Sequence, residues 1–365
     1  MRVRPRYLFY AALVAPALLV ALEILLRLAV MLPLSSPSFV HDADIGYRMA
    51  DGVAGTRGGF NTSLTPGEAL PSGKRLLFVG DSFTYGTYPA ARVFPERVAD
   101  RLTGSGVPAI ALSRGLPAAG PSNYLRVAEF FTEQLDPDVV VVTVYLGNDI
   151  EQSHPRQETR LFLGAVATVN QPHRFGLNRE DYYVYLAARK ARAVLLYRLA
   201  EKPAPLSPLV EEQGRTSAPF SPDQLFRAYR REIRNFESPS SRFIQEALGG
   251  LVARLIGLRG IVGDRTLLIV LAPSRVQVDA QFREELMRHW NLDPHDYCVT
   301  CIGDSVREDL SASDISVLDL TPSFMQVQKE HELYNQMDTH WNLAGNELSA
   351  NLITDWVRHK LEESK

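Results

Sequence analysis

Three short polar clusters contain the side chains that acyl transfer through a serine requires. They are Gly80-Asp81-Ser82, Gly147-Asn148-Asp149 and the pair Asp338 and His340. A serine hydroxyl is a poor nucleophile at neutral pH, so it needs a histidine to take its proton and a carboxylate to orient that histidine. Hydrogen-bond donors must also face the oxyanion that develops on the substrate. The hydroxyl of Ser82, the ring of His340 and the amide of Asn148 are therefore candidates for this chemistry.

Each cluster also has an ordinary structural interpretation. Ser82 could be the N-cap of a helix that follows a strand, a lone asparagine is commonly a turn residue, and a lone histidine is commonly packed or at the surface. The position of the clusters favours chemistry. Ser82 and Asn148 each follow an apolar run typical of a buried strand, and ligands bind at the carboxyl ends of strands in open α/β sheets.

The apolar runs predict a parallel α/β sheet. Five of them have the length and composition of buried strands: 76–79, 107–112, 139–146, 266–271 and 316–320. Segments with helical spacing lie between or after them, including 93–102, 123–135, 279–289 and 343–361. Alternating strands and helices imply parallel pairing with right-handed crossovers.

At these clusters the sequence resembles the SGNH (GDSL-type) hydrolase superfamily. GDSFT at Gly80–Thr84 matches the first sequence block of that family, and SRGLPAAGPSN at Ser113–Asn123 resembles the second. GND at Gly147–Asp149 matches the third block, and DTHWN at Asp338–Asn342 resembles the fifth. The resemblance covers residues 76–361 apart from most of an insertion. It implies a three-layer, flavodoxin-like sandwich with a five-stranded parallel sheet in the order 2-1-3-4-5.

The resemblance also implies a role for each candidate residue. Ser82 is the nucleophile, His340 is the base and Asp338 orients that base. The expected oxyanion-hole donors are the N–H of Ser82, the side chain of Asn148 and the N–H of Ala118. Five further residues are expected to support the site, with Gly115 or Gly120 as alternative donors: Asp81, Gly115, Gly120, Gly147 and Asp149. Neither a metal nor an organic cofactor is implied.

Two positions depart from the family pattern. Ala118 stands where the second block usually has glycine, if Ser113 aligns with the asparagine of that block. Asp338 and His340 are two residues apart, whereas the usual spacing is three. Close Asp-x-His versions followed by tryptophan occur among members that act on acetylated polysaccharides, so the pair fits the resemblance.

The N-terminal segment predicts a membrane anchor. Arginines at positions 2, 4 and 6 precede an apolar stretch, 7–34, that only Glu23 and Arg27 interrupt. About 20 apolar residues span the hydrocarbon core of a bilayer, and a basic flank stays in the cytoplasm. We therefore expect a single-pass protein of the inner membrane with its catalytic domain on the periplasmic side. A signal peptide cleaved near Ala15-Pro16-Ala17 is the alternative.

Composition divides the chain into three parts. Residues 1–34 are the predicted anchor, 35–72 a linker or irregular segment with room for a hairpin, and 73–365 the SGNH hydrolase-like domain. The interval of about 150–265 is longer than a crossover needs, so we expect a helical insertion that forms a lid over the strand ends. Its basic helix, 182–199, either lies on the membrane or is a lid helix with a solvated face.

The predicted function is hydrolysis of an acyl ester outside the cytoplasm, on an O-acylated glycan or a related ester. The expected location, rather than any binding residue, indicates this substrate class. One alternative is an O-acetyltransferase of exported polysaccharide that works through an acyl-enzyme on Ser82. A second is a non-catalytic protein that binds glycan or scaffolds an envelope complex. The net charge of −3 gives no reason to expect nucleic acid.

A further cluster contains the only two cysteines. Cys298 and Cys301 lie close in sequence to His289 and His295, and four such side chains could hold zinc. Outside the cytoplasm the cysteines could instead form a short-loop disulfide. We expect a loop with a disulfide or free thiols and no metal, because serine chemistry does not need one.

Overall fold

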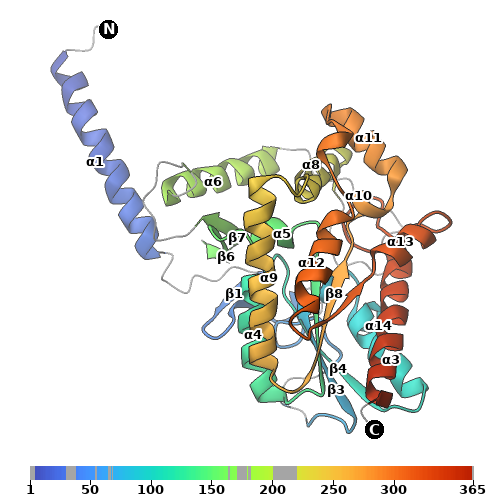
Figure 1. Ribbon diagram of the computed structural model, residues 1–365. Helices are drawn as coiled ribbons and strands as arrows, with labels where there is room; N and C mark the ends of the chain where they lie inside the picture. Colours follow the sequence, from blue (N-terminus) through green and yellow to red (C-terminus); the bar gives the residue numbers. More distant parts are fainter. Residues whose placement is uncertain are drawn as a thin grey trace.

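A central parallel sheet lies between two layers of helices in the computed structural model (Figure 1). The structure describes residues 5–29, 38–53, 56–64, 67, 69–162, 165–170, 179, 182–199 and 220–363. Five strands form the sheet: β3 (Lys74–Gly80), β4 (Ala109–Gly115), β5 (Val139–Tyr145), β8 (Thr266–Ala272) and β9 (Ser316–Asp319). The α/β fold with a five-stranded parallel sheet is confirmed.

The strands follow one another across the sheet as β4-β3-β5-β8-β9. Counted along the chain, this order is 2-1-3-4-5. All seven residues of the central strand β5 are buried, which explains its unbroken apolar sequence: helices cover both faces of a parallel sheet. Because β3 pairs with both β4 and β5, the loops that leave these three strands start side by side.

Strand β4 differs from its predicted range. It runs to Gly115 rather than ending at Leu112, because Ser113, Arg114 and Gly115 pair with the last three residues of β3. The loop after β4 therefore begins only at Leu116, within the segment Ser113–Asn123 that resembles the second block.

Two helix layers cover the sheet (Figure 1). One contains α4 (Pro121–Leu135), α9 (Arg242–Val262) and α12 (Cys301–Ser311), and its apolar side chains form one core with one face of the strands. The other contains α3 (Phe94–Gly104), α13 (Thr321–Val327) and α14 (Leu343–Glu363), which form the second core. The largest buried side chains of the second core include Trp341 and Phe324.

The predicted lid over 150–265 is wrong for α9. This helix buries Ile244, Leu251 and Leu258 in the first core and packs along α4, so it belongs to the sandwich itself. Other elements do gather at the carboxyl end of the sheet: α8 (Pro222–Glu232), η4 (Ile233–Phe236), α10 (Arg275–Val278) and α11 (Ala280–Trp290). The insertion also contains the hairpin β6 (Gln157–Phe162) and β7 (Ala165–Asn170), and α6 (Tyr183–Leu199).

Short elements complete the described chain. Strands β1 (Phe39–Asp42) and β2 (Gly46–Met49) form an antiparallel hairpin within the segment predicted as linker or hairpin. Four short helices belong here as well: α2 (Ser82–Tyr85), η2 (Ala90–Arg92), α5 (Asp149–Gln152) and η5 (Pro294–Asp296). Of these, α2 and α5 directly follow β3 and β5.

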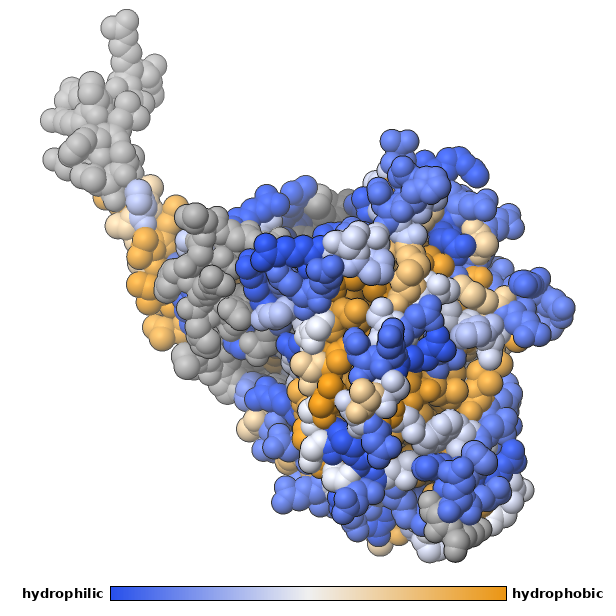
Figure 2. Space-filling view, viewed as in Figure 1, coloured by the Kyte–Doolittle hydropathy of each residue, from blue (hydrophilic) through white to orange (hydrophobic). Residues whose placement is uncertain are grey.

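The N-terminal helix α1 (Pro5–Ala29) projects from the rest of the molecule (Figure 1). Side chains such as Leu18 and Leu25 are exposed along it, and Figure 2 shows this apolar surface. Glu23 is buried; Arg27 Nε donates to it at 2.7 Å, and the N–H of Tyr183 in α6 donates to it at 3.1 Å. The arginines at positions 2 and 4 lie outside the described residues. Over the described part of the chain, no helix is both long and apolar enough to cross a membrane, so the anchor is not confirmed.

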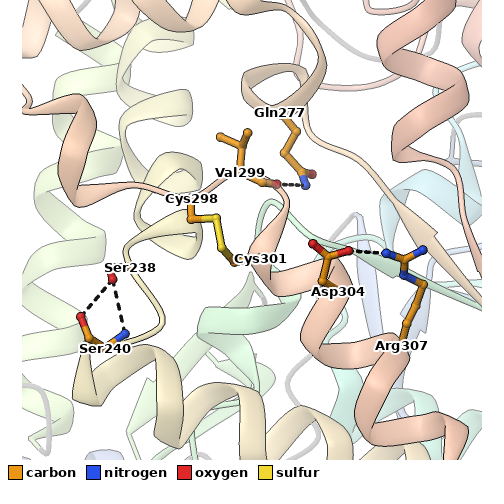
Figure 3. The surroundings of a disulfide bond; sticks show 8 residues. All are labelled: Ser238, Ser240, Gln277, Cys298, Val299, Cys301, Asp304 and Arg307. Carbon is orange, nitrogen blue, oxygen red and sulfur yellow. Dashed lines mark hydrogen bonds and ion pairs between the residues drawn. A yellow bond between two sulfur atoms is a disulfide. The ribbon is translucent and has the colours of Figure 1, made fainter.

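Cys298 and Cys301 form a disulfide with a Cα–Cα distance of 5.5 Å (Figure 3). Disulfide sulfurs are not the thiolates that ligate zinc, so both the free-thiol and the zinc interpretations are wrong in this state. Between the two cysteines, the carbonyl of Val299 accepts a hydrogen bond from Gln277 Nε2 at 2.8 Å. Cys301 is the first residue of α12, so the disulfide joins that helix to the loop before it.

Replacing both Cys298 and Cys301 by serine should lower the free energy of unfolding by about 2 kcal/mol, because a short cross-link restricts the unfolded chain only slightly. Urea unfolding of the oxidised protein and of the double variant measures this difference. A reductant should move the midpoint of the native protein to that of the variant and leave the variant unchanged. Equal midpoints for the oxidised protein and the variant would contradict the prediction.

Candidate active site

The nucleophile candidate lies in a tight turn at the end of β3. Asp81 is the N-cap of α2, and its Oδ1 accepts a hydrogen bond from the N–H of Phe83 at 2.8 Å. Ser82 is the next residue, so its hydroxyl is not the cap that the structural interpretation assigned to it. A Cβ on Gly80 would lie 2.1 Å from Thr84 Oγ1. A side chain at position 80 would therefore collide with Thr84 beneath the turn of Ser82.

The base candidate and its carboxylate lie in the loop before α14. His340 Nδ1 is 2.6 Å from Asp338 Oδ1, and Asp338 is 3% exposed. A donor at Nδ1 leaves Nε2 free to accept a proton, and this atom is buried without a hydrogen-bond partner. The imidazole ring lies 5.0 Å from the ring of Phe83, the residue that follows Ser82. Two-residue spacing is therefore compatible with an oriented base next to the nucleophile turn.

No hydrogen bond joins Ser82 to His340 in the described part of the chain. Hydrogen bonds between catalytic groups are often long in the free enzyme and tighten when substrate binds. The structure thus brings the two residues into one site without closing the contact.

Asn335 holds the loop that carries His340. Its side-chain amide donates to the carbonyls of His340 at 3.1 Å and Trp341 at 3.0 Å. Its Oδ1 accepts from the hydroxyl of Tyr88 at 2.8 Å, and Tyr88 belongs to the segment after α2. This residue links the base loop to the nucleophile side of the site. Sequence reasoning missed it, because a lone asparagine outside the family blocks carries no signal.

The oxyanion candidates come from three neighbouring turns. Asn148 Nδ2 donates to Asp81 Oδ2 at 3.4 Å, which joins the turn after β5 to the turn after β3. One amide hydrogen of Asn148 is then still available, since the group has two. The loop that carries Ala118 starts beside the same turn, because the N–H of Leu116 donates to the carbonyl of Gly80 at 2.9 Å.

Ala118 has a left-handed backbone, with φ of 62°. Glycine adopts this conformation without steric cost, which fits the usual glycine of the second block. Ala118 is exposed, and its N–H donates to no acceptor among the described residues. The N–H of Gly120 already donates to Asn123 Oδ1 at 3.2 Å, so it is the weaker candidate.

The predicted supporting glycines are sites of close packing. A Cβ on Gly115 would lie 2.3 Å from the backbone nitrogen of Tyr85, so β4 packs directly against the nucleophile helix. A Cβ on Gly120 would lie 2.5 Å from Gln152 Oε1 in α5. A Cβ on Gly147 would lie 2.5 Å from the ring of Tyr145. Larger side chains at these positions would separate the turns that carry the candidate residues.

Buried carboxyl groups surround the site. Burial raises the pKa of Asp81 to about 6, although the N–H of Phe83 and the nearby His340 stabilise its charged form. Burial and the Asp81 carboxyl raise the pKa of Asp149 well above its usual range. Asp149 is bonded to the hydroxyl of Tyr124 at 2.9 Å and to the N–H of Tyr145 at 2.8 Å. Asp149 therefore fixes the start of α5 rather than acting on substrate.

The pKa of His340 is raised above its ordinary value. Burial lowers it, but the carboxylate of Asp338, through its charge and its hydrogen bond, raises it by more, and Asp81 and Glu232 act in the same direction. The imidazolium that forms during proton transfer is therefore stabilised by carboxylates, as a general base next to a serine requires.

A family model described as "SGNH hydrolase-like domain, acetyltransferase AlgX" matches residues 225–365. This range contains Asp338 and His340 but not Ser82 or Asn148. No curated protein sequence matches the chain.

Several solved structures are similar to this one. A lipase/acylhydrolase from Enterococcus faecalis is 14% identical with a TM-score of 0.40, over 79% of this chain and 96% of that one. A catalytic mutant of the acetylxylan esterase Axe2 from Geobacillus stearothermophilus is 12% identical with a TM-score of 0.38, over 78% and 94%. The acetyl xylan esterase AlAXEase is 12% identical with a TM-score of 0.42, over 78% and 99%.

The family match confirms the resemblance to SGNH (GDSL-type) hydrolases. The matched range contains the Asp338–His340 pair, whose hydrogen-bonded side chains lie in the loop before α14. The match over residues 225–365 supports an SGNH-type enzyme, either an ester hydrolase or an acyltransferase.

Ala118→Gly should raise the free energy of unfolding by about 1 kcal/mol, because glycine removes the steric cost of the left-handed backbone. The matched control is Ala119→Gly, at a neighbouring buried residue with no positive φ, which should lower that free energy. Urea unfolding of both variants measures the two changes. A loss of stability in Ala118→Gly would show that the exposed methyl group makes a favourable contact.

Asp338→Asn should move the pH–rate profile to lower pH. The neutral ring of His340 is the base, so kcat/KM rises as the pH passes upward through its pKa. The Asp338 carboxylate raises that pKa through its charge and its hydrogen bond, so its loss leaves the lowering effect of burial opposed only by Asp81 and Glu232. The plateau rate should also fall about 10³- to 10⁴-fold, because the carboxylate no longer selects the reactive tautomer. A profile with an unchanged midpoint would contradict the assignment.

Proposed function

We propose that the protein is a serine-dependent acyl-ester hydrolase that acts outside the cytoplasm on O-acylated glycan or a related ester. The observation that carries this proposal is the 2.6 Å contact between Asp338 and His340, with a free His340 Nε2 beside the turn of Ser82. A protein that only binds glycan does not need an oriented imidazole with a free Nε2 beside a serine whose hydroxyl does not cap a helix.

The proposed reaction has two steps, acylation of Ser82 and hydrolysis of the acyl-enzyme. Ser82 Oγ attacks the ester carbonyl carbon while its proton passes to His340 Nε2, and the oxyanion forms between the N–H groups of Ser82 and Ala118 and the amide of Asn148. The C–O bond to the alcohol then breaks, and the alcohol leaves with the proton from His340. Water attacks the acyl-enzyme, gives its proton to His340, and releases the acid as Ser82 Oγ recovers that proton.

Two observations support a location outside the cytoplasm. Structural disulfides persist in oxidising compartments, and Cys298 and Cys301 form one. The segment 1–34, basic and then apolar, has the composition of an export or anchor sequence. The family model that matches residues 225–365 is described by an acetyltransferase, which favours an acetyl ester as the substrate.

That match also favours a second candidate, an O-acetyltransferase of exported polysaccharide. The first half-reaction is the same, and a sugar hydroxyl replaces water in the second. The two candidates differ only in the acceptor of the acyl group on Ser82, so one experiment separates them.

Ser82→Ala should abolish release of p-nitrophenol from p-nitrophenyl acetate by the full-length protein in detergent, because no acyl-enzyme can form. The control is Ser105→Ala, at the opposite end of the sheet after α3, whose hydroxyl bonds the carbonyl of Leu102. It should turn over like the native protein. The assay is repeated with oligosaccharide acceptors, and the sugar is analysed by mass spectrometry.

Acetate in solution with no acetylated sugar supports the hydrolase. Acetyl groups that appear on the sugar, and depend on Ser82, support the transferase. Turnover that persists in Ser82→Ala would overturn the mechanism. A native protein without Ser82-dependent turnover that still binds glycan would be the non-catalytic protein instead.

A further inference from the structure

A buried carboxylate from the insertion lies beside the site, and its hydrogen bonds go to residues outside the proposed catalytic set. Glu232 is the last residue of α8 and is 8% exposed. Its Oε2 accepts hydrogen bonds from Tyr145 Oη at 2.7 Å and from Ser274 Oγ at 2.6 Å. Burial of a carboxylate is costly unless it is hydrogen-bonded, so these two contacts have to offset the loss of water. Tyr145 and Ser274 end or follow β5 and β8, so Glu232 ties two neighbouring strand ends together.

The ring of Tyr145 contacts both turns of the proposed mechanism. It stacks on Phe83, the residue after Ser82, with a centroid distance of 3.8 Å and an interplanar angle of 23°. A Cβ on Gly147, the residue before Asn148, would lie 2.5 Å from the same ring. The ring therefore packs against the turn of Ser82 and against the turn of Asn148. Its hydroxyl is held by Glu232, so the carboxylate fixes the ring and the ring sets the spacing of the turns.

Asn235 bonds directly to the turn that carries Asn148, which we call the oxyanion turn. Its Nδ2 donates to the carbonyl of Gly147 at 2.7 Å, and its Oδ1 accepts from the N–H of Glu151 at 2.7 Å. These backbone groups lie on either side of Asn148. Asn235 is 1% exposed and comes three residues after Glu232, so one short segment contacts both the ring and the turn.

The loop that contains the disulfide also contacts the segment of Glu232 and Asn235. The N–H of Cys298 donates to the carbonyl of Phe236, the residue after Asn235, at 2.8 Å. Gln277, which bonds Val299 in Figure 3, also accepts from the N–H of Ser274 at 2.9 Å. The loop thus bonds the segment directly at Phe236. Through Gln277 it is also linked to Ser274, the residue whose hydroxyl donates to Glu232.

We propose that Glu232 and Asn235, the turn clamp, are positioning residues that hold the oxyanion turn of Asn148 at the correct distance from Ser82. The proposal rests on the proposed serine mechanism. An oxyanion donor stabilises the transition state only when its hydrogen lies close to where the charge develops. A small displacement of Asn148 therefore lowers the rate of the chemical step and leaves ground-state binding of the ester unchanged.

The chain offers variants that separate positioning from packing. Glu232→Gln keeps an acceptor for Tyr145 and Ser274, and it resembles the neutral acid that burial favours by raising the pKa of Glu232 to about 7. Glu232→Leu removes the acceptor at similar volume. Asn235→Ala removes both contacts to the oxyanion turn. The matched control is Asn346→Ala, since Asn346 is 3% exposed and also bonds two backbone groups, the N–H of Phe94 and the carbonyl of Asn342.

Steady-state kinetics with p-nitrophenyl acetate on the full-length protein give the first readout. Asn235→Ala and Glu232→Leu should lower kcat about 10- to 100-fold with KM unchanged within about twofold, as for a misplaced oxyanion donor. Glu232→Gln should stay within about threefold of the native kcat, because the hydrogen bonds persist. Asn346→Ala should lose stability but retain the native kcat.

Hydrogen–deuterium exchange of the peptide over 145–152 gives a second readout that needs no turnover. Asn235→Ala should speed exchange there, and Asn346→Ala should not. Native kinetics in both Asn235→Ala and Glu232→Leu would overturn the clamp while the serine mechanism stands. Equal losses in Glu232→Gln and Glu232→Leu would also overturn it, since an acceptor would then not suffice. A native protein without Ser82-dependent turnover would defeat the proposed function, and unchanged exchange in Asn235→Ala would then defeat the clamp separately.

Discussion

The pairing of β3 with β5 is the constraint on which the rest of the site depends. Parallel strands in direct contact end at the same edge of the sheet, so the turns after Gly80 and after Tyr145 leave it side by side. The hydrogen bond from Asn148 to Asp81 spans the two turns. Because α2 and α5 start within these turns, their first residues face the same space. The Asp338 loop reaches this space from the last helix of the other layer.

Close packing around that edge leaves little freedom for the residues that build it. Gly80, Gly115 and Gly147 each lie where a Cβ would meet another group at 2.1–2.5 Å. Each contact joins two elements: β3 with α2, β4 with α2, and the oxyanion turn with Tyr145. Since interiors of this density transmit small displacements, a change at any of these positions would move the candidate catalytic groups relative to one another.

The site also concentrates carboxyl groups in a poorly solvated region. Burial raises the pKa of three of them above the usual range: Asp81, Asp149 and Glu232. Each of the three carboxyl groups accepts hydrogen bonds. Buried acids of this kind cost stability and are common near functional sites. Here these acids raise the pKa of His340 or fix backbone turns. The direct hydrogen-bond partner of His340 is still Asp338. The insertion thus contributes to the interior of the site through Glu232.

Local sequence determined the strands, the α/β class and the chemical candidates, because apolar runs and short polar blocks depend only on neighbouring residues. Glycine at positions 80, 115 and 147 was visible as a pattern, but the atoms that exclude a side chain there come from other elements. The roles of α9 and of Glu232, Asn235 and Asn335 required the tertiary structure. An amphipathic helix has the same sequence whether it covers a sheet or a cleft, and a lone polar residue carries no sign of its distant partner. Likewise, two cysteines three apart suit a metal, thiols or a disulfide, and only the fold around Cys298 and Cys301 decided between them.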